Sequence, residues 1–167
     1  MELSMKSIKH SEFASEETYC YEAVVYLDGK PFANVRNQGH GGCDIVHPHD
    51  KSPLLKEKGA WRKKLDEVEA YFNTLPNADV GKYDWCPDGF VQTFETWCGE
   101  QVTNFLHKKD MQRVMRTKHL FKTSDGLFEV RHEVKVARIM RDYPDAVILN
   151  DLPIDEALEI YKEATNG

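Results

Sequence analysis

The sequence has few cysteines and no membrane-length apolar run, and these absences exclude several classes of protein. Its four cysteines, Cys20, Cys43, Cys86 and Cys98, form no Cys-x-x-Cys pair, so we expect reduced thiols and no disulfide framework. No apolar run approaches the length that crosses a bilayer. The first ten residues, MELSMKSIKH, lack the apolar core of a secretory signal. We therefore expect a cytoplasmic protein with no membrane partner.

The chain also lacks internal repeats, low-complexity tracts and any linker that would divide it. At 167 residues it is long enough to bury a core, and we expect residues 1–167 to form a single domain. A hydrophobic content of 41% argues against disorder.

Net positive charge is absent as well, because 28 acidic residues outnumber 22 Lys and Arg and give a formal net charge of −6. Non-specific nucleic-acid binding needs Lys and Arg to neutralise phosphates, so nucleic acid is not an expected partner. Basic residues nevertheless gather between residues 107 and 122, with Arg113 and Arg116 at the centre of this strip. The strip is typical of a solvated helix face, and it could also bind a phosphate-bearing ligand or an acidic partner.

The first half of the sequence predicts an antiparallel sheet followed by helices. Residues 2–10 are a candidate edge strand, and Asp28-Gly29 between two apolar runs predicts a two-residue hairpin turn. That turn would place Val25 opposite Phe32 and Val24 opposite Ala33. Helical spacing of apolar residues predicts one helix over 52–72, capped by Ser52, and a second from about residue 90, with a break near 109–110.

The second half predicts another hairpin and further helices. Ser-Asp-Gly at 124–126 separates two strand-like runs, a helix is expected over about 133–143, and residues 146–149 form a short strand candidate. Pro153 opens a last helix. The expected fold class is α+β: an N-terminal antiparallel hairpin or sheet packed against several helices, with a second hairpin and a short strand in the C-terminal half.

The segment NQGHGGCDIVHPHD, residues 37–50, is the main candidate site, since it holds three glycines and three histidines. Glycines at 39, 41 and 42 allow positive φ and could aim successive N–H groups at one anion. The segment lacks the Lys-Ser/Thr of a P-loop, and its glycine spacing is not that of a dinucleotide fold. A phosphate cradle of another kind is therefore one interpretation.

Three other interpretations of residues 37–50 stay open. His40, Cys43, His47 and His49 are all zinc-ligand types, although no second knuckle accompanies them. Cys43 could act as a nucleophile with a neighbouring histidine as base, although no oxyanion element is visible. The segment could also be a purely structural turn over the sheet, with Ile45 and Val46 returning to the core.

The motifs DGKPFANVRNQGHGGCD, ILNDLP and EAL resemble an uncharacterised family of small proteins from tailed phages and bacterial genomes, with an N-x-G-x-G-G-C loop after a β-hairpin. The matching segments are 24–48 and 144–158. The resemblance brings no catalytic residue with it. It implies an accessory or counter-defence protein acting in the host cytoplasm.

The function expected from the sequence is therefore binding without catalysis, and no cofactor or metal is expected. The favoured ligand is a phosphate-bearing small molecule such as a nucleotide signal. The alternatives are direct inhibition of a host protein, and a zinc- or cysteine-dependent hydrolase centred on Cys43. A homo-oligomer could build a shared pocket. The candidate binding residues are Asn37, Gly39, His40, Gly41, Gly42, Cys43, Asp44, His47, Arg113 and Arg116.

Overall fold

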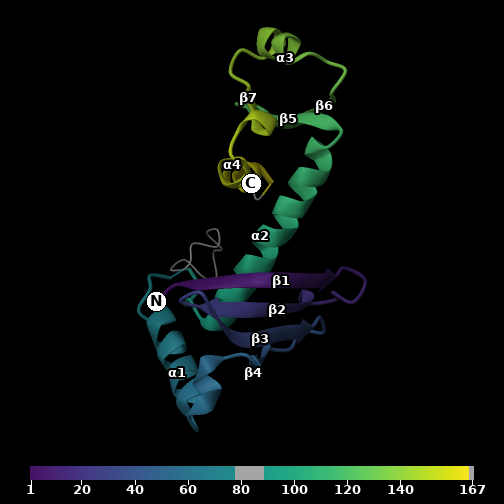
Figure 1. Cartoon of the computed structure of the whole chain (residues 1–167). Helices are drawn as coiled ribbons and strands as arrows, with labels where there is room; N and C mark the ends of the chain where they lie inside the picture. Colours follow the sequence, from purple (N-terminus) through teal and green to yellow (C-terminus); the bar gives the residue numbers. More distant parts are fainter. Residues whose placement is uncertain (78–88, 166–167) are drawn as a thin grey trace. The chain divides into compact units, whose positions relative to one another are not determined.

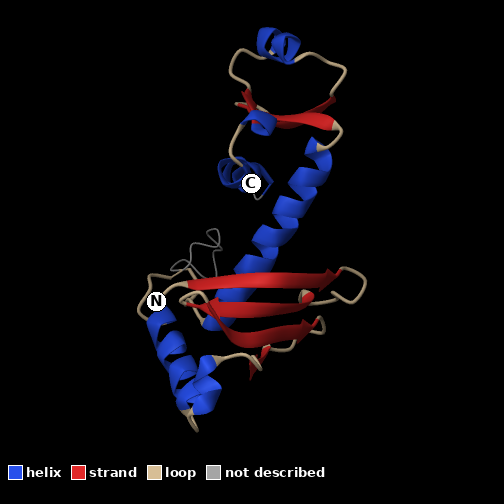
Figure 2. Cartoon of the chain, viewed as in Figure 1, coloured by secondary structure: helices blue, strands red, loops and turns tan. Residues whose placement is uncertain are grey.

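The computed structural model describes residues 1–77 and 89–165 of the chain (Figures 1 and 2). The chain divides into two compact units, residues 1–102 and 103–167, and the boundary falls within one helix. Each unit contains an antiparallel sheet and helical segments, which confirms the expected α+β class. Among the described helices, none is long and apolar enough to cross a membrane. The single-domain expectation stays a prediction.

The first unit contains a four-stranded antiparallel sheet in the order β1-β2-β3-β4 (Figure 1). Its strands are β1 (Leu3–Ser11), β2 (Cys20–Leu27), β3 (Lys30–Gln38) and β4 (Ile45–Pro48). The edge strand and the hairpin at Asp28-Gly29 were both expected. The turn residues have φ of 48° and 75°, as a type I′ turn requires. Strand β4 was not expected, because residues 45–48 were assigned to a loop.

The register of the β2–β3 hairpin differs by one residue from the prediction. The pairs next to the turn are Leu27–Lys30 and Tyr26–Pro31, but the following pair is Val25–Ala33. Phe32 is therefore an extra residue in β3, which makes a β-bulge. The predicted pairs Val25–Phe32 and Val24–Ala33 are wrong for this reason.

The helical segments of the first unit pack against one face of its sheet. The predicted helix over 52–72 is in fact two elements, a 3₁₀ helix η1 (Pro53–Lys56) and α1 (Ala60–Phe72). Gly59 separates them with a φ of 82°, a conformation that a helix cannot continue through. The side chain of Ser52 makes no capping hydrogen bond, contrary to expectation.

Helix α2 (Phe94–Met115) runs without the break expected near residues 109–110. Its first turns carry the buried side chains Phe94, Cys98 and Val102. Together with α1, they close the face of the sheet on which Tyr21, Ala23, Val25, Leu27 and Val35 are buried. Alternate residues of the same strands, including Glu22, Asn34 and Arg36, are exposed on the opposite face.

The second unit contains a three-stranded antiparallel sheet in the order β6-β5-β7. The expected hairpin is β5 (Lys118–Thr123) and β6 (Gly126–Arg131), and the expected short strand is β7 (Val147–Ile148). Helix α3 (Val136–Asp142) is shorter than predicted, and α4 (Ile154–Thr165) follows Pro153 as predicted. The 3₁₀ turn η2 (Leu149–Asp151) connects β7 to α4.

Strand β5 places successive side chains in two separate cores. Leu120 packs in one core with Met111, Leu149, Ala157 and Leu158. Phe121 packs in the other core with Ile139, Ala146 and Ile148. This alternation follows from the two-residue period of a strand.

Candidate functional site

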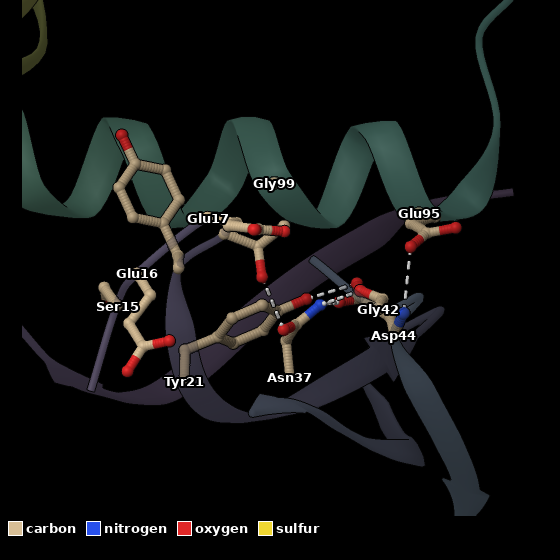
Figure 3. A pocket seen from close by; sticks show the side chains of 11 residues that line it. Ser15, Glu16, Glu17, Tyr21, Asn37, Gly42, Asp44, Glu95 and Gly99 are labelled. Carbon is tan, nitrogen blue, oxygen red and sulfur yellow. Dashed lines mark hydrogen bonds between the residues drawn. The ribbon is translucent and has the colours of Figure 1, made fainter. Parts of the chain in front are cut away.

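The segment 37–44 folds around the side chain of Asn37, which is buried at the end of β3. The Asn37 Oδ1 atom accepts hydrogen bonds from the Thr18 hydroxyl and from the Gly39 N–H, both at 2.9 Å. Its Nδ2 atom donates to the Gly42 carbonyl at 2.8 Å and to Asp44 Oδ1 at 3.0 Å (Figure 3). These bonds use both donors and both acceptor positions of the amide, so Asn37 holds the loop and has no capacity left for a ligand.

Gly39 joins this loop to the β1–β2 loop. Its carbonyl accepts hydrogen bonds from the N–H groups of Glu16, Glu17 and Thr18, at 3.0, 3.0 and 3.3 Å. Its φ is +89°, and a Cβ atom here would lie 1.9 Å from the carbonyl oxygen of Ala14. Glycine is therefore required at position 39 for two reasons, a left-handed backbone and the close approach of a neighbouring chain segment.

Three N–H groups of this loop already have hydrogen-bond acceptors within the chain. Gly39 N–H binds Asn37, Gly41 N–H binds the Thr18 hydroxyl at 3.3 Å, and Asp44 N–H binds Glu95 Oε1 at 2.9 Å. The loop thus already binds a carboxylate, which the chain itself supplies from the first turn of α2. Gly39 and Gly41 could donate to a phosphate only by giving up these partners, and the phosphate role expected for the glycines stays a prediction.

Tyr21, Asp44 and Glu95 form the polar wall beside Asn37, and the buried Cys98 thiol interacts with Tyr21. The Tyr21 hydroxyl donates a short hydrogen bond to Asp44 Oδ2 (Figure 3). Burial raises the pKa of the Asp44 carboxyl, and the neighbouring Glu95 carboxylate raises it further, against the opposing effect of the hydrogen bonds from Tyr21 and Asn37. Burial is also the main cause that raises the pKa of the Tyr21 hydroxyl and the pKa of the Cys98 thiol. Both groups therefore stay protonated at neutral pH.

A pocket of about 380 Å³ opens between these residues and the β1–β2 loop. Its lining consists of residues 15–19 together with Tyr21, Asn37, Gly42, Asp44, Glu95 and Gly99 (Figure 3). Four of these residues carry carboxylates, namely Glu16, Glu17, Asp44 and Glu95. No lysine, arginine or histidine is among the lining residues. The pocket is therefore strongly acidic, with two tyrosine rings in its wall.

The other predicted loop residues point elsewhere. His40 is exposed, and its Nδ1 atom lies 3.2 Å from Glu16 Oε2. Cys43 is exposed as well. His47 lies in β4 opposite Asn34, on the exposed face of the sheet, and it lines a different hollow of about 330 Å³ together with Lys9 and Arg36. The structure therefore brings Asn37, Gly42 and Asp44 into one pocket and directs His47 to another surface.

Arg113 and Arg116 belong to the second unit, and the ligand role predicted for them stays a prediction. Both are exposed, Arg113 in the last turn of α2 and Arg116 just after it. Several charges of the basic strip are already paired. Arg113 lies 3.3 Å from Asp110, Lys108 lies 3.0 Å from Asp155, and Lys118 is paired with Glu129.

The zinc and cysteine alternatives gain no support from the geometry. Within the described residues, no three or more of the His, Cys, Asp and Glu side chains are grouped to hold a metal ion. His40 Nδ1 contacts Glu16, and His47 lines a different hollow on the exposed face of the sheet. Cys86 lies outside the described residues.

Several residues of the pocket were missed by the sequence reading. Thr18, Glu16 and Glu17 come from a loop with no motif, and Glu95 lies in an expected helix without a second carboxylate that would form an acid–base pair with it. Tyr21 alone had a usable signal, since it shares the inward alternation of Ala23 and Val25 in β2. Comparison of the chain with protein-family models, with curated proteins and with solved structures found no match in any of the three.

Proposed function

We propose that this protein works by binding, and that the pocket at the 37–44 loop takes a positively charged group, an ammonium or guanidinium, on an apolar stem. The observation that carries the proposal is the lining of the pocket, which includes four carboxylates and no basic side chain. Its volume of about 380 Å³ suits a small ligand or a single long side chain.

The charges of the pocket support a cation over a phosphate. Opposite charges a few ångströms apart gain energy from attraction, and the same carboxylates would repel a phosphate by a comparable amount. The rings of Tyr19 and Tyr21 are of the kind that attract cations through their faces. The charges of this pocket do not favour a phosphate-bearing ligand, which stays a prediction. The counter-defence role that the family resemblance implies also stays a prediction.

The proposal is tested by calorimetric titration with agmatine and cadaverine as cationic probes, and with inorganic phosphate and ATP as anionic probes. We expect the cations to bind and the anions not to bind. The Glu95→Gln variant keeps an oxygen that can accept from Asp44 N–H but loses the charge. Since a hydrogen bond to a charged group contributes about 1.5–3 kcal/mol, we expect agmatine affinity to fall roughly tenfold or more.

Glu100→Gln is the matched control, because Glu100 lies on the same helix, is exposed and does not line the pocket. It should leave agmatine affinity unchanged. Binding of the anionic probes in place of the amines would overturn the proposal, and so would equal losses of affinity in both variants.

A further inference from the structure

Phe13 is completely exposed, unlike every other phenylalanine of the chain. Its relative exposure is 100%, whereas each of the other seven phenylalanines is exposed by 37% or less. Burying a phenylalanine side chain gains about 1.5–3 kcal/mol, and this gain is not realised within the first unit. Phe13 is therefore a large apolar surface that remains available to a partner.

The β1–β2 loop that carries Phe13 (residues 12–19) is held in one conformation by hydrogen bonds. Phe13 is a central residue of a turn that Ser15 N–H closes on the Glu12 carbonyl at 3.1 Å. The Ser15 hydroxyl donates to the Ser11 carbonyl at 2.7 Å and accepts from Cys20 N–H at 2.8 Å. The Gly39 carbonyl then accepts hydrogen bonds from the N–H groups of residues 16–18. A braced loop loses little conformational entropy when it binds, so its contacts are realised as affinity.

The loop that carries Phe13 is rich in acidic residues. Glu12 precedes Phe13, and Glu16 and Glu17 follow it within four residues. The acidic pocket begins at Ser15, two residues after Phe13, and extends to Asp44 and Glu95. The chain as a whole has a formal net charge of −6. A partner that complements this surface has an apolar pocket with basic residues at its rim.

We propose that the β1–β2 loop is a protein-docking element: Phe13 enters an apolar pocket of a partner protein, and a lysine or arginine beside that pocket enters the acidic pocket. This inference rests on the proposed function, because it names a basic side chain of a protein as the cation. A second copy of the chain is a poor occupant, since two acidic loops repel each other.

A displayed library of random 12-residue peptides is the probe for this proposal. We expect the wild-type protein to select peptides in which Lys or Arg lies within a few residues of a large apolar side chain. For one synthesised peptide from that pool, Phe13→Ala should weaken binding about thirtyfold, as for a buried aromatic anchor. Phe13 is fully exposed, so its replacement is not expected to disturb the fold.

Val91→Ala is the control, because Val91 is another exposed apolar residue of the first unit, with 59% exposure, and should leave peptide affinity unchanged. If Phe13→Ala binds the peptide with unchanged affinity and still binds agmatine, the docking role of the loop is overturned and the proposed function is not. Selected peptides without Lys or Arg, together with no binding of agmatine, would overturn the proposed function itself. A concentration-dependent dimer in sedimentation that Phe13→Ala abolishes would identify a second copy as the occupant and would also overturn the inference.

Discussion

Replacing Gly39 by alanine tests whether the 37–44 segment is primarily a brace for the β1–β2 loop. The new Cβ atom would lie 1.9 Å from the Ala14 carbonyl oxygen and 3.0 Å from Cys20 Cβ. A backbone oxygen cannot turn aside as a flexible side chain can. The β1–β2 loop must therefore move away from Gly39, and this movement disrupts the hydrogen bonds between the two segments.

The expected loss of stability is the sum of two contributions. Holding a residue other than glycine in a left-handed conformation costs about 1–2 kcal/mol. Moving the loop breaks the three hydrogen bonds that the Gly39 carbonyl accepts, and each contributes roughly 0.5–1.5 kcal/mol. The free energy of unfolding should fall by about 2.5–6.5 kcal/mol, which is a large share of the ~5–15 kcal/mol typical of a domain.

Two other glycines separate these contributions. Gly29 also has a positive φ, of +75°, but a Cβ there would meet no heavy atom within 4 Å, so Gly29→Ala should cost only about 1–2 kcal/mol. Gly42 has neither constraint, and Gly42→Ala should change stability by less than about 0.5 kcal/mol. All three tryptophans belong to residues 1–102, so tryptophan fluorescence during urea unfolding reports on the first unit. If Gly39→Ala costs no more than Gly29→Ala, the loop is not braced as described.

Three further outcomes are expected. Asn150 accepts a hydrogen bond from Leu120 N–H at 2.7 Å, so Asn150→Ala should speed hydrogen exchange of the Leu120 amide; unchanged exchange would contradict the contact. Because the pKa of Asp44 is raised on folding, its contribution to stability is full below the unfolded value of about 4 and is lost as the pH rises through the folded value. In urea unfolding between pH 4 and 7, Asp44→Asn should lack this loss, and an equal slope in both proteins would refute the assignment. The exposed thiol of Cys43 should react rapidly with a disulfide reagent, whereas buried Cys98 should react only on unfolding, so Cys43→Ser and not Cys98→Ser removes a fast-reacting equivalent.

The features that the sequence predicted well are those with local causes. The turn at Asp28-Gly29 requires two residues with positive φ, and this requirement is visible in the two letters themselves. The last helix is marked by Pro153 and by acidic residues in its first turn. Gly59 is a weak helix former, but a glycine inside a helix costs only about 1 kcal/mol. The sequence therefore did not show that the helix would be interrupted at this residue.

The site was only half predictable, because its members come from distant segments. The 37–44 segment was recognised from its composition, yet the role of its glycines and of Asn37 is to accept a neighbouring loop. That partner loop, residues 12–18, has no motif of its own. Glu95 reaches the Asp44 amide across 51 positions of sequence, and no local pattern encodes this pairing. The sign of the charge in the pocket follows from these distant contributions, so the phosphate interpretation could not have been tested from residues 37–50 alone.

The bulge at Phe32 determines the chemistry of the pocket. Phe32 and Ala33 are both buried, although successive residues of a regular strand face opposite sides of the sheet. This extra residue places Asn37 opposite Tyr21 on the covered face and Arg36 opposite Glu22 on the exposed face. In the uninterrupted register, Arg36 would be opposite Tyr21, and a guanidinium would stand where the amide now holds the loop.

Contacts from outside the hairpin hold the bulged residue. The Phe32 carbonyl accepts hydrogen bonds from Trp61 Nε1 at 3.0 Å and from His49 N–H at 3.1 Å, and the Phe32 ring packs on that of Trp61. Helix α1 therefore supplies a hydrogen-bond donor for the carbonyl of Phe32, the residue that the bulge leaves without a partner residue in β2. Helix α1 thus helps to hold the register that places Asn37, and not Arg36, beside the pocket that the four carboxylates line.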